Sequence, residues 1–272
     1  MKKIFFSLLG VWLLFQSCEE VVDVDLPKTE SRLVIDALIR VDTSQPDNLI
    51  RVNALETASF FEELQPARLN TISITNLNSG TAISLERSGE SSSAYEAVVP
   101  KDFITNGNFL LQAEHKGRTY TATSSFFPSV PIDNLEQGND ILFEETDIEV
   151  KVRFTDDGTT DDFYLFDFDF GEYLTSRDDF YQGQQFEFSY FYEELQPGEV
   201  IRVNLLGIDQ AFYNYMNQVI EQSGGDGFTP FATPVSALRG NIQSEQDTTE
   251  DFAFGYFIVS ETFSDSLIVQ EK

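Results

Sequence analysis

From Arg32 onward, apolar and polar residues alternate along short runs that are rich in β-branched and aromatic side chains. The runs in the first half read RLVIDALIRV, LIRVNAL, TISITNL, AISLER, YEAVVP and FLLQAEHKGRTYTATSSF. Turn-forming residues, such as those in Asn76–Gly80 and Lys116-Gly117, separate them. Because successive side chains of a strand point to opposite faces, the alternation predicts half-buried strands. Short strands at this spacing, with no helical periodicity between them, predict an antiparallel, Ig-like β-sandwich over residues 31–130.

The segment FFPSVPI ends this block, and its prolines, Pro128 and Pro131, mark the predicted domain boundary. Residues 131–272 are predicted to form a second sandwich-like, β-rich domain, so the fold class is mainly β. This domain opens with an alternating strand over 147–154. The apolar face of that strand is formed by Ile148, Val150, Val152 and Phe154.

One helix is predicted in the second half, over residues 209–223. Asp209 is of a residue type that caps helix N-termini, and Gly224-Gly225 follows as a stop signal. The apolar positions between them are Phe212, Tyr215, Met216, Val219 and Ile220. They form a single stripe, so the helix is expected to pack on the sheet through that face.

Residues 162–173, DFYLFDFDFGEY, set aspartates into a run of phenylalanines. Alternation over this stretch places its aromatic residues, Tyr164, Phe166, Phe168 and Phe170, on one face of a strand. Asp167, Asp169 and Gly171 fall on the other face, with the two carboxylates about 7 Å apart. The favoured interpretation is the solvated side of a half-buried strand. The alternative is a metal-binding or catalytic pair.

The polar turn DDGTTDD, residues 156–162, offers several carboxylates to a cation such as Ca²⁺. It lacks the D-x-D-x-D-G spacing of an EF-hand loop. The sequence therefore predicts a solvated turn here, and no metal site or cofactor is predicted for the chain.

A second aromatic segment, residues 178–195, contains almost no aliphatic side chain. Alternation places Phe186, Phe188 and Tyr190 on one face, whereas Phe191 and Tyr192 break that pattern. Aromatic residues that cannot all face one core are typical of binding surfaces. We therefore predict that these five residues contact a partner, with a hairpin covered by its own domain as the alternative.

The charge balance narrows the choice of partner. The chain has 46 acidic and 17 basic residues, a formal net charge of −29, and no basic stripe. Such a surface repels a phosphate backbone, which argues against nucleic-acid binding. It is also not attracted to anionic lipid, so any attachment to a membrane requires another device.

The first eighteen residues, MKKIFFSLLGVWLLFQSC, supply that device. Two lysines precede an apolar run that is too short to span a bilayer, which is the layout of a secretory signal peptide over residues 1–17. Cys18, the only cysteine, follows a small residue and resembles a bacterial lipobox cysteine. Diacylation of Cys18 would anchor the chain to outer-membrane lipid. The alternative is a plain signal peptide with an incidental cysteine.

Residues 18–30 are predicted to be an acidic tether between the anchor and the first domain. Their acidic patch resembles the surface-export signal of Bacteroidota lipoproteins, but a plain solvated tether accounts for it equally well. The sequence therefore leaves undecided whether the anchored chain lies on the cell surface or on the periplasmic face.

Catalytic signatures are sparse. The single histidine, His115, lies beside Lys116-Gly117 in a predicted hairpin turn, where it is expected to be exposed. There is no HExxH motif, cysteine cluster or phosphate-binding glycine loop. Glycoside hydrolysis by paired carboxylates stays open, although nothing singles out a pair. The sequence therefore favours a protein that is not an enzyme.

Several short motifs in a fixed order resemble one known family. They are Asp23–Pro27 after the cysteine, Arg32–Ala37, Gly117–Ala122, Asp162–Phe166, Ala211–Tyr215, Pro230-Phe231, Arg239–Ile242 and Phe254–Phe257. In this order they resemble a family of Bacteroidota outer-membrane lipoproteins catalogued only as a domain of unknown function. Members of that family usually begin with a β-sandwich and tend to be encoded beside TonB-dependent transporters. The resemblance supplies no catalytic residue.

The resemblance implies a non-enzymatic, lipid-anchored accessory protein of the outer membrane. Its expected partner is a β-barrel TonB-dependent transporter or its complex. The alternative function is a surface lipoprotein that binds glycans or another ligand, although the segment after the signal peptide contains no tryptophan platform.

Overall fold

Nearly every alternating run of the sequence forms a strand in the computed structural model, which describes residues 31–58, 64–142, 146–193, 195–223, 237–245 and 252–271. The strands of the first half are β1 (Leu33–Val41), β2 (Asp47–Glu56), β3 (Gln65–Pro66), β4 (Thr71–Asn76), β5 (Thr81–Ser84), β6 (Glu86–Arg87), β7 (Ala94–Pro100), β8 (Asn108–His115) and β9 (Arg118–Phe127). Those of the second half are β10 (Ile132–Gln137), β11 (Ile148–Thr155), β12 (Phe163–Asp167), β13 (Tyr173–Arg177), β14 (Gln185–Tyr192), β15 (Val200–Ile208), β16 (Gln243–Ser244) and β17 (Phe254–Ile268). The helical elements are α2 (Lys101–Ile104), the short 3-10 helix η2 (Asp178–Phe180) and α3 (Gln210–Ser223). The predicted fold class, mainly β and sandwich-like, is confirmed.

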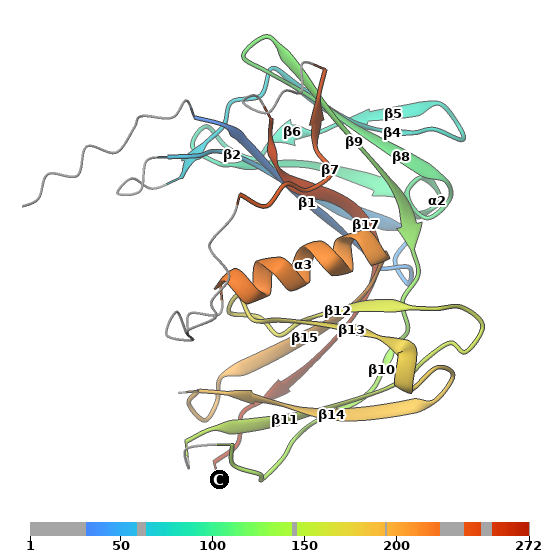
Figure 1. The fold of residues 1–272 in the computed structure, drawn as a ribbon, viewed down its shortest axis with the longest axis vertical. Coiled ribbons are helices and arrows are strands. Elements are labelled where there is room, and N and C mark those ends of the chain that lie inside the picture. The colour runs from blue at the N-terminus through green and yellow to red at the C-terminus, as the bar shows by residue number, and fades with distance from the viewer. Residues whose placement is uncertain are drawn as a thin grey trace, which may run out of the picture. The chain divides into compact units, whose positions relative to one another are not determined.

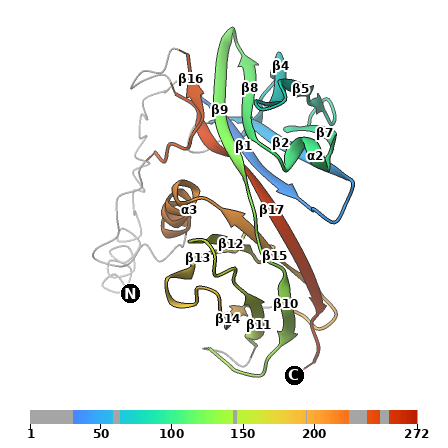
Figure 2. The same ribbon diagram turned by 90° about the vertical axis from the view of Figure 1, so that its right-hand side faces the viewer.

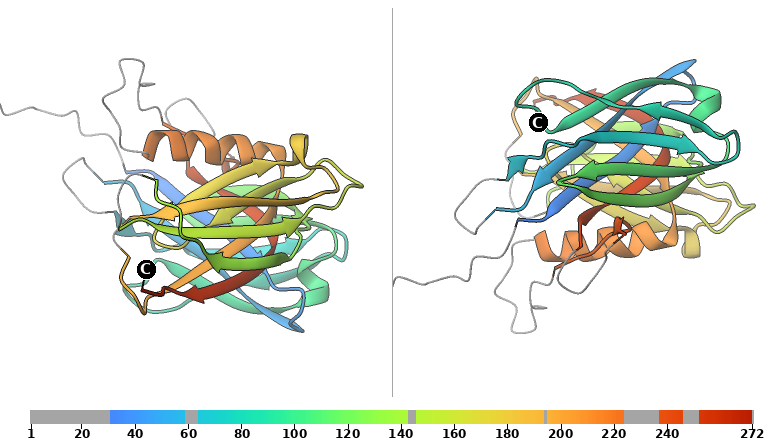
Figure 3. Two further views of the ribbon diagram at one scale, coloured as in Figure 1. Left: turned by 90° about the horizontal axis from the view of Figure 1, so that it is seen from below. Right: turned by 90° about the horizontal axis from the view of Figure 1, so that it is seen from above.

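The first half folds one long sheet over itself. Its strand order is β5-β4-β8-β9-β17-β1-β2-β7-β6, and Figures 1 and 3 show β4, β5 and β8 lying over β1, β2 and β7. Alternate side chains of β1, from Leu33 to Val41, point inward and are fully or almost fully buried. They meet the inward residues of β4 and β8, such as Ile74 and Phe109, in one hydrophobic cluster. The predicted alternation therefore identifies the core face correctly.

Strand β17 joins this sheet to the second half (Figure 2). Its first part, from Phe254 to Glu261, lies parallel to β1 and also meets the end of β9. Its second part, from Thr262 to Ile268, pairs antiparallel with β15. The sheets are therefore antiparallel, as predicted, except where β17 runs parallel to β1 and β9. A parallel neighbour cannot come from a hairpin, so local sequence gives no sign of this pairing.

Two sheets enclose the second hydrophobic cluster. Strands β13, β12, β15 and the end of β17 form one layer, and β10, β11 and β14 form the other. Between them lie the predicted apolar face of β11 and the aromatic residues of β12. The link between β9 and β10 spans the predicted boundary at residues 130 and 131. The division of the chain into two domains at that point stays a prediction.

Helix α3 confirms the predicted helix. The Asp209 carboxylate accepts a hydrogen bond from the Phe212 backbone N–H at 2.7 Å, as expected for an N-cap. Phe212 and Met216 are buried in a third cluster, against the outer faces of β12 and β15 and against residues of β1 and β17. The predicted stop signal, Gly224-Gly225, lies outside the described residues. Among the described residues, no helix is both long enough and apolar enough to cross a bilayer.

The structure overturns the prediction that Asp167 and Asp169 line a solvated strand face. Both faces of β12 are covered, because the helix layer packs on the side opposite the aromatic residues. Asp167 is buried and pairs with Arg40 of β1, with Asp167 Oδ2 2.5 Å from Arg40 Nη2. The strand then ends, and Asp169, Phe170 and Gly171 all have positive φ. Phe170 is 64% exposed instead of extending the aromatic wall.

Candidate functional site

The aromatic segment predicted to contact a partner forms strand β14. Phe186, Phe188 and Tyr190 alternate with exposed residues and pack, half-buried, against the second hydrophobic cluster. The prediction that Tyr192 breaks this alternation is wrong. Tyr192 continues the same face, is buried, and donates a hydrogen bond from its hydroxyl to the Phe168 carbonyl at 2.8 Å. Only Phe191 points to the other side.

Ring contacts separate these residues into two groups. Phe186 stacks on Tyr181 with ring centroids 4.6 Å apart, and Phe188 meets Phe166 edge-on at 5.0 Å. These two side chains mainly cover the core of their own sandwich. Tyr190, Phe191 and Tyr192 instead line a surface cavity of about 310 Å³. The prediction that all five residues contact a partner stays a prediction, and the geometry concentrates it on the last three.

The other walls of the cavity come from the turn after β12 and from the chain that follows β14. The full lining is Phe170, Glu172, Tyr190, Phe191, Tyr192, Glu193 and Leu195. Its floor is the Tyr190 ring, which stacks on the buried Phe168 ring at a centroid distance of 3.9 Å. The cavity therefore has a preformed aromatic floor and two acidic side chains at its rim, both of them exposed.

A tight turn presents Phe170 to this cavity. The Glu172 backbone N–H donates to the Asp169 carbonyl at 2.9 Å, and the two central residues, Phe170 and Gly171, have φ of 54° and 83°. This is the conformation of a type I′ turn, which glycine adopts readily and a bulky residue rarely does. A left-handed conformation at a residue with a side chain costs about 1–3 kcal/mol and concentrates at functional sites. Sequence reasoning missed this turn, although Gly171 was its available signal.

The electrostatics of the cavity favour a positively charged group. The Tyr190 hydroxyl donates to Glu172 Oε2 at 2.9 Å. Burial, this hydrogen bond and the nearby Glu172 and Glu193 carboxylates raise the pKa of Tyr190. Burial and the neighbouring Tyr190 and Asp169 likewise raise the pKa of Tyr192. Both phenols are therefore neutral at physiological pH. Aromatic faces beside carboxylates form a suitable environment for a cation.

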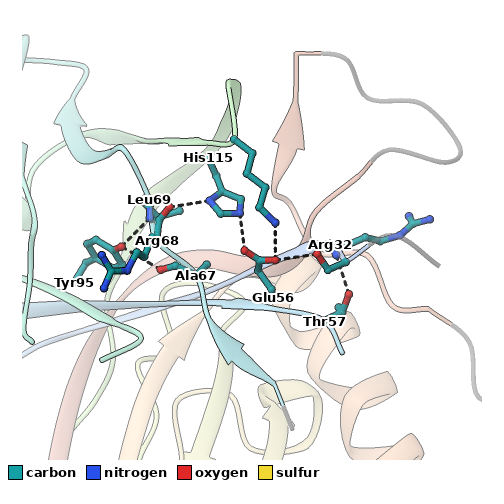
Figure 4. Close-up of polar contacts among 10 residues, drawn as sticks. Arg32, Glu56, Thr57, Ala67, Arg68, Leu69, Tyr95 and His115 are labelled. Atoms are coloured by element: carbon teal, nitrogen blue, oxygen red, sulfur yellow. Dashed lines mark hydrogen bonds and ion pairs between the residues drawn. The ribbon is translucent and has the colours of Figure 1, made fainter. Parts of the chain in front are cut away.

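The prediction that His115 is exposed is wrong. Its ring lies buried beneath the 65–70 segment, with Nδ1 3.0 Å from the Arg68 carbonyl oxygen and Nε2 3.2 Å from Glu56 Oε1 (Figure 4). Burial alone would raise the pKa of Glu56, but hydrogen bonds from Lys116 and Ser31 outweigh it and lower that pKa. Because both nitrogens of His115 are engaged in these contacts, neither is left to accept a proton from a substrate.

Three aspartates of the predicted polar turn and its surroundings lie close together. Asp156, Asp162 and Asp178 each place a carboxylate oxygen within 4.8 Å of the others. Protein donors already occupy much of this cluster. Asp156 accepts hydrogen bonds from the Tyr164 hydroxyl and the Gly183 N–H, and Asp178 accepts one from the Asp162 N–H. The absence of a metal site therefore stays a prediction from sequence.

A second concave surface of about 440 Å³ lies on the outer face of β1 and β2. Its lining residues are Asp36, Leu38, Arg40, Leu49, Arg51, Asn53 and Tyr173. Both arginines there are already paired, Arg40 with Asp167 and Arg51 with Glu96. The predicted lipidation site, Cys18, and the predicted signal peptide and tether, residues 1–17 and 18–30, lie outside the described residues.

Comparisons with known proteins give one match over most of the chain. A family model described as a domain of unknown function, DUF4249, matches residues 19–266. No curated protein matches the sequence.

Solved structures with some similarity include a cytokine receptor complex in its second crystal form, at 10% identity and a TM-score of 0.26, covering 64% of this chain and 90% of that one. Another is a 1.5-MDa bacterial ice-binding adhesin, at 9% identity and a TM-score of 0.22, covering 89% of this chain and 64% of that one. A third is the chicken interferon gamma receptor alpha chain, at 10% identity and a TM-score of 0.20, covering 66% and 90%. TM-scores this low carry no argument about function.

Proposed function

This chain belongs to the family described as a domain of unknown function, DUF4249, and from that membership we propose that it is a lipid-anchored, non-enzymatic accessory protein of the outer membrane. In this proposal it acts as a component or partner of a TonB-dependent transporter complex in a bacterium of the Bacteroidota. The observation that carries the proposal is Cys18, placed directly after a short apolar run and a small residue. Two or more acyl chains at that cysteine give stable attachment where one chain gives only marginal binding.

The charge of the chain supports a lipid anchor as the means of attachment. A net charge of −29 opposes adsorption to anionic lipid, so the folded body has no electrostatic route to a membrane. The proposal of a partner is supported by the cavity beside Tyr190, where an exposed phenylalanine lies beside the half-buried Tyr190 and the buried Tyr192. Aromatic residues of this kind are enriched where proteins bind one another. A non-enzymatic role is supported by His115, whose ring nitrogens both bind protein oxygens.

The test of the anchor compares Cys18→Ser with Ser17→Ala in the native host. Ser17→Ala keeps a small residue before the cysteine, so it is expected to stay in the outer-membrane fraction with an acylated N-terminus. Cys18→Ser is expected to leave that fraction. Mass spectrometry of the mature wild-type protein that finds an unacylated Cys18 would refute the anchor.

The test of the partner is purification of the full chain from detergent-solubilised outer membranes, followed by identification of co-purifying proteins. We expect a large β-barrel transporter in stoichiometric amounts with the wild-type protein. Recovery of the lipoprotein alone, under conditions that preserve other outer-membrane complexes, would contradict the proposed partnership.

A second function, binding of a glycan or small ligand at the surface, is favoured by the same cavity. Its tyrosine rings and carboxylates provide a stacking surface and hydrogen-bond acceptors. Calorimetry against a panel of polysaccharides tests this function, with Phe170→Ala as the cavity variant and Phe180→Ala as its control. Phe180 is equally aromatic and 92% exposed, but it does not line the cavity. Equal affinity of both variants for a bound glycan would exclude the cavity as its site.

A further inference from the structure

Strand β14 is an unprotected sheet edge. In the three-stranded sheet β10-β11-β14, seen from below in Figure 3, it pairs with β11 alone among the described residues. It is eight residues long, and its register with β11 is regular throughout. The opposite edge of the same sheet, β10, carries a register shift between Ile132 and Asn134, which is a common way to blunt an edge. Strand β14 has no such irregularity.

A hydrogen bond at the end of the sheet shows which backbone groups of β14 point away from β11. The Asp156 N–H donates to the Gln184 carbonyl, so that pair is hydrogen-bonded across the β11–β14 ladder. In an antiparallel ladder such pairs alternate, which directs the backbone groups of even-numbered residues, 186 to 192, toward β11. The N–H and C=O groups of Gln185, Glu187, Ser189 and Phe191 therefore point away from the sheet. They form a row of donors and acceptors that an added strand can pair with.

The aromatic cavity lies along this same edge. Its lining includes Tyr190 and Phe191, whose side chains point to opposite faces of β14. A cavity that contacts both side chains must lie beside the strand, because one that lay on a single face would contact only one of them. Since β11 occupies one side, the cavity lies at the free one. A side chain from an added strand would meet the Tyr190 ring, the exposed Phe170 ring and the carboxylates of Glu172 and Glu193. Lysine and arginine fit this combination, because their apolar stems pack on rings while their charged ends pair with carboxylates.

We propose that the free edge of β14 takes up an extended segment of a partner protein as a fourth strand, and that a lysine or arginine of that segment enters the cavity between Phe170 and Tyr190. Backbone hydrogen bonds supply the pairing, and the cavity selects the basic residue. The β14 edge of a second copy does not fit as the added strand, because β14, QFEFSYFY, contains no basic residue and carries Glu187. The identification of the partner as a protein of an outer-membrane complex rests on the proposed function.

The experiment selects peptides from a displayed random library against the full-chain protein in nanodiscs. Glu187→Pro removes an outward N–H from the edge, and proline is tolerated at such positions. Glu187→Ala is its matched control, because both variants lose the contact from Arg153 Nε at 2.7 Å but only proline removes the donor. Glu172→Gln/Glu193→Gln removes the cavity charges. Glu86→Gln/Glu90→Gln is the charge-matched control at two exposed sites outside the cavity.

We expect the enriched peptides to share an alternating pattern with one lysine or arginine. Their affinity is expected to fall about tenfold in Glu172→Gln/Glu193→Gln and in Glu187→Pro, and to change less than about twofold in both controls. Circular dichroism melting establishes that each variant is folded. If Glu187→Pro fails to fold, the cavity variant still decides the proposal. Failure to enrich any sequence, or enriched peptides that lack a basic residue or bind all variants equally, would overturn it.

The same variants separate this inference from the proposed function. If purification recovers a β-barrel with both wild type and Glu187→Pro, the transporter partnership stands and the edge of β14 is not its site. If wild type recovers no barrel but peptide binding follows the expected pattern, the edge binds a different partner and the proposed function is wrong.

Discussion

The ion pair between Arg40 and Asp167 connects β1 of the first half to β12 of the second, and its removal gives a sharp test of the structure. The Arg40 side chain is 36% exposed, whereas that of Asp167 is 8% exposed. Asp167 retains a hydrogen bond from the Asp169 N–H at 3.0 Å when the arginine is removed. Breaking a fully buried pair costs about 3–5 kcal/mol and an exposed one about 0.2–1 kcal/mol. The burial of the Arg40–Asp167 pair is intermediate between these two cases, so we expect Arg40→Ala to lower the free energy of unfolding by about 2 kcal/mol.

Urea denaturation of Arg40→Ala, Asp167→Asn and the double variant measures the coupling directly. We expect the double variant to be more stable than the sum of the single effects predicts, with a coupling energy of about 1 kcal/mol. Arg51→Ala is the control, because Arg51 pairs with Glu96 while its own side chain is 58% exposed. Its loss is expected to cost less than about 1 kcal/mol. Additivity of the Arg40 and Asp167 effects to within about 0.5 kcal/mol would refute a stabilising interaction between the two side chains.

Three further predictions concern stability. Gly255→Ala is expected to lower the free energy of unfolding in urea by more than about 3 kcal/mol, because φ is +100° and the new Cβ would lie 1.9 Å from the Ile35 carbonyl oxygen. Its control, Gly80→Ala, at φ +71° with open space, is expected to lower it by about 1 kcal/mol, and equal losses would contradict the close strand packing. The pKa of Asp162 is raised by burial and by Asp156 and Asp178, so its ionised form opposes folding. Asp162→Asn is therefore expected to raise the urea midpoint at pH 7, and this gain should shrink as the pH falls through the pKa of Asp162; a gain that does not change with pH would count against the mechanism. Burial would raise the pKa of Glu149, but hydrogen bonds from Ser189 and the Asp140 N–H lower it, so the contribution of Glu149 to stability is present near neutral pH and lost on acidification. Glu149→Gln is expected to lower the free energy of unfolding by about 1–3 kcal/mol at pH 7 and to reduce the loss of stability in acid, whereas an unchanged dependence of stability on pH would exclude this role.

Local patterns predict the elements of this fold well, because those elements are half-buried strands and one capped helix. The alternation in 33–41 and 148–155 reports which side chains meet the core, and each strand forms where it is expected. Asp209 and the apolar stripe after it define α3 for the same reason. The signals lie within a few residues of one another, so no knowledge of distant contacts is needed.

The features that the sequence does not predict depend on contacts between residues that are far apart in the chain. Asp167 lies on a polar position of an alternating run, yet the helix layer covers that face, and Arg40, more than a hundred residues earlier, neutralises its charge. His115 is the last residue of β8, at a hairpin turn, but its ring is held by Glu56 and by the Arg68 carbonyl. The cavity beside Tyr190 requires Phe170 to leave the strand, and alternation extended through Gly171 hides that turn. The cavity is therefore found only once the turn after β12 and the end of β14 are placed together.

Strand β17 also constrains the order in which the protein can assemble. Among the described residues, the backbone pairing of the first sheet passes from β1 to β9 through residues 254–261, so this sheet stays incomplete until β17 is available. The chain therefore cannot complete its first half during synthesis, however early that half emerges. Such late, long-range closure predicts slow folding from a denatured chain. A truncation that removes β17 would unfold β1 at the opposite end of the sequence as well as β15.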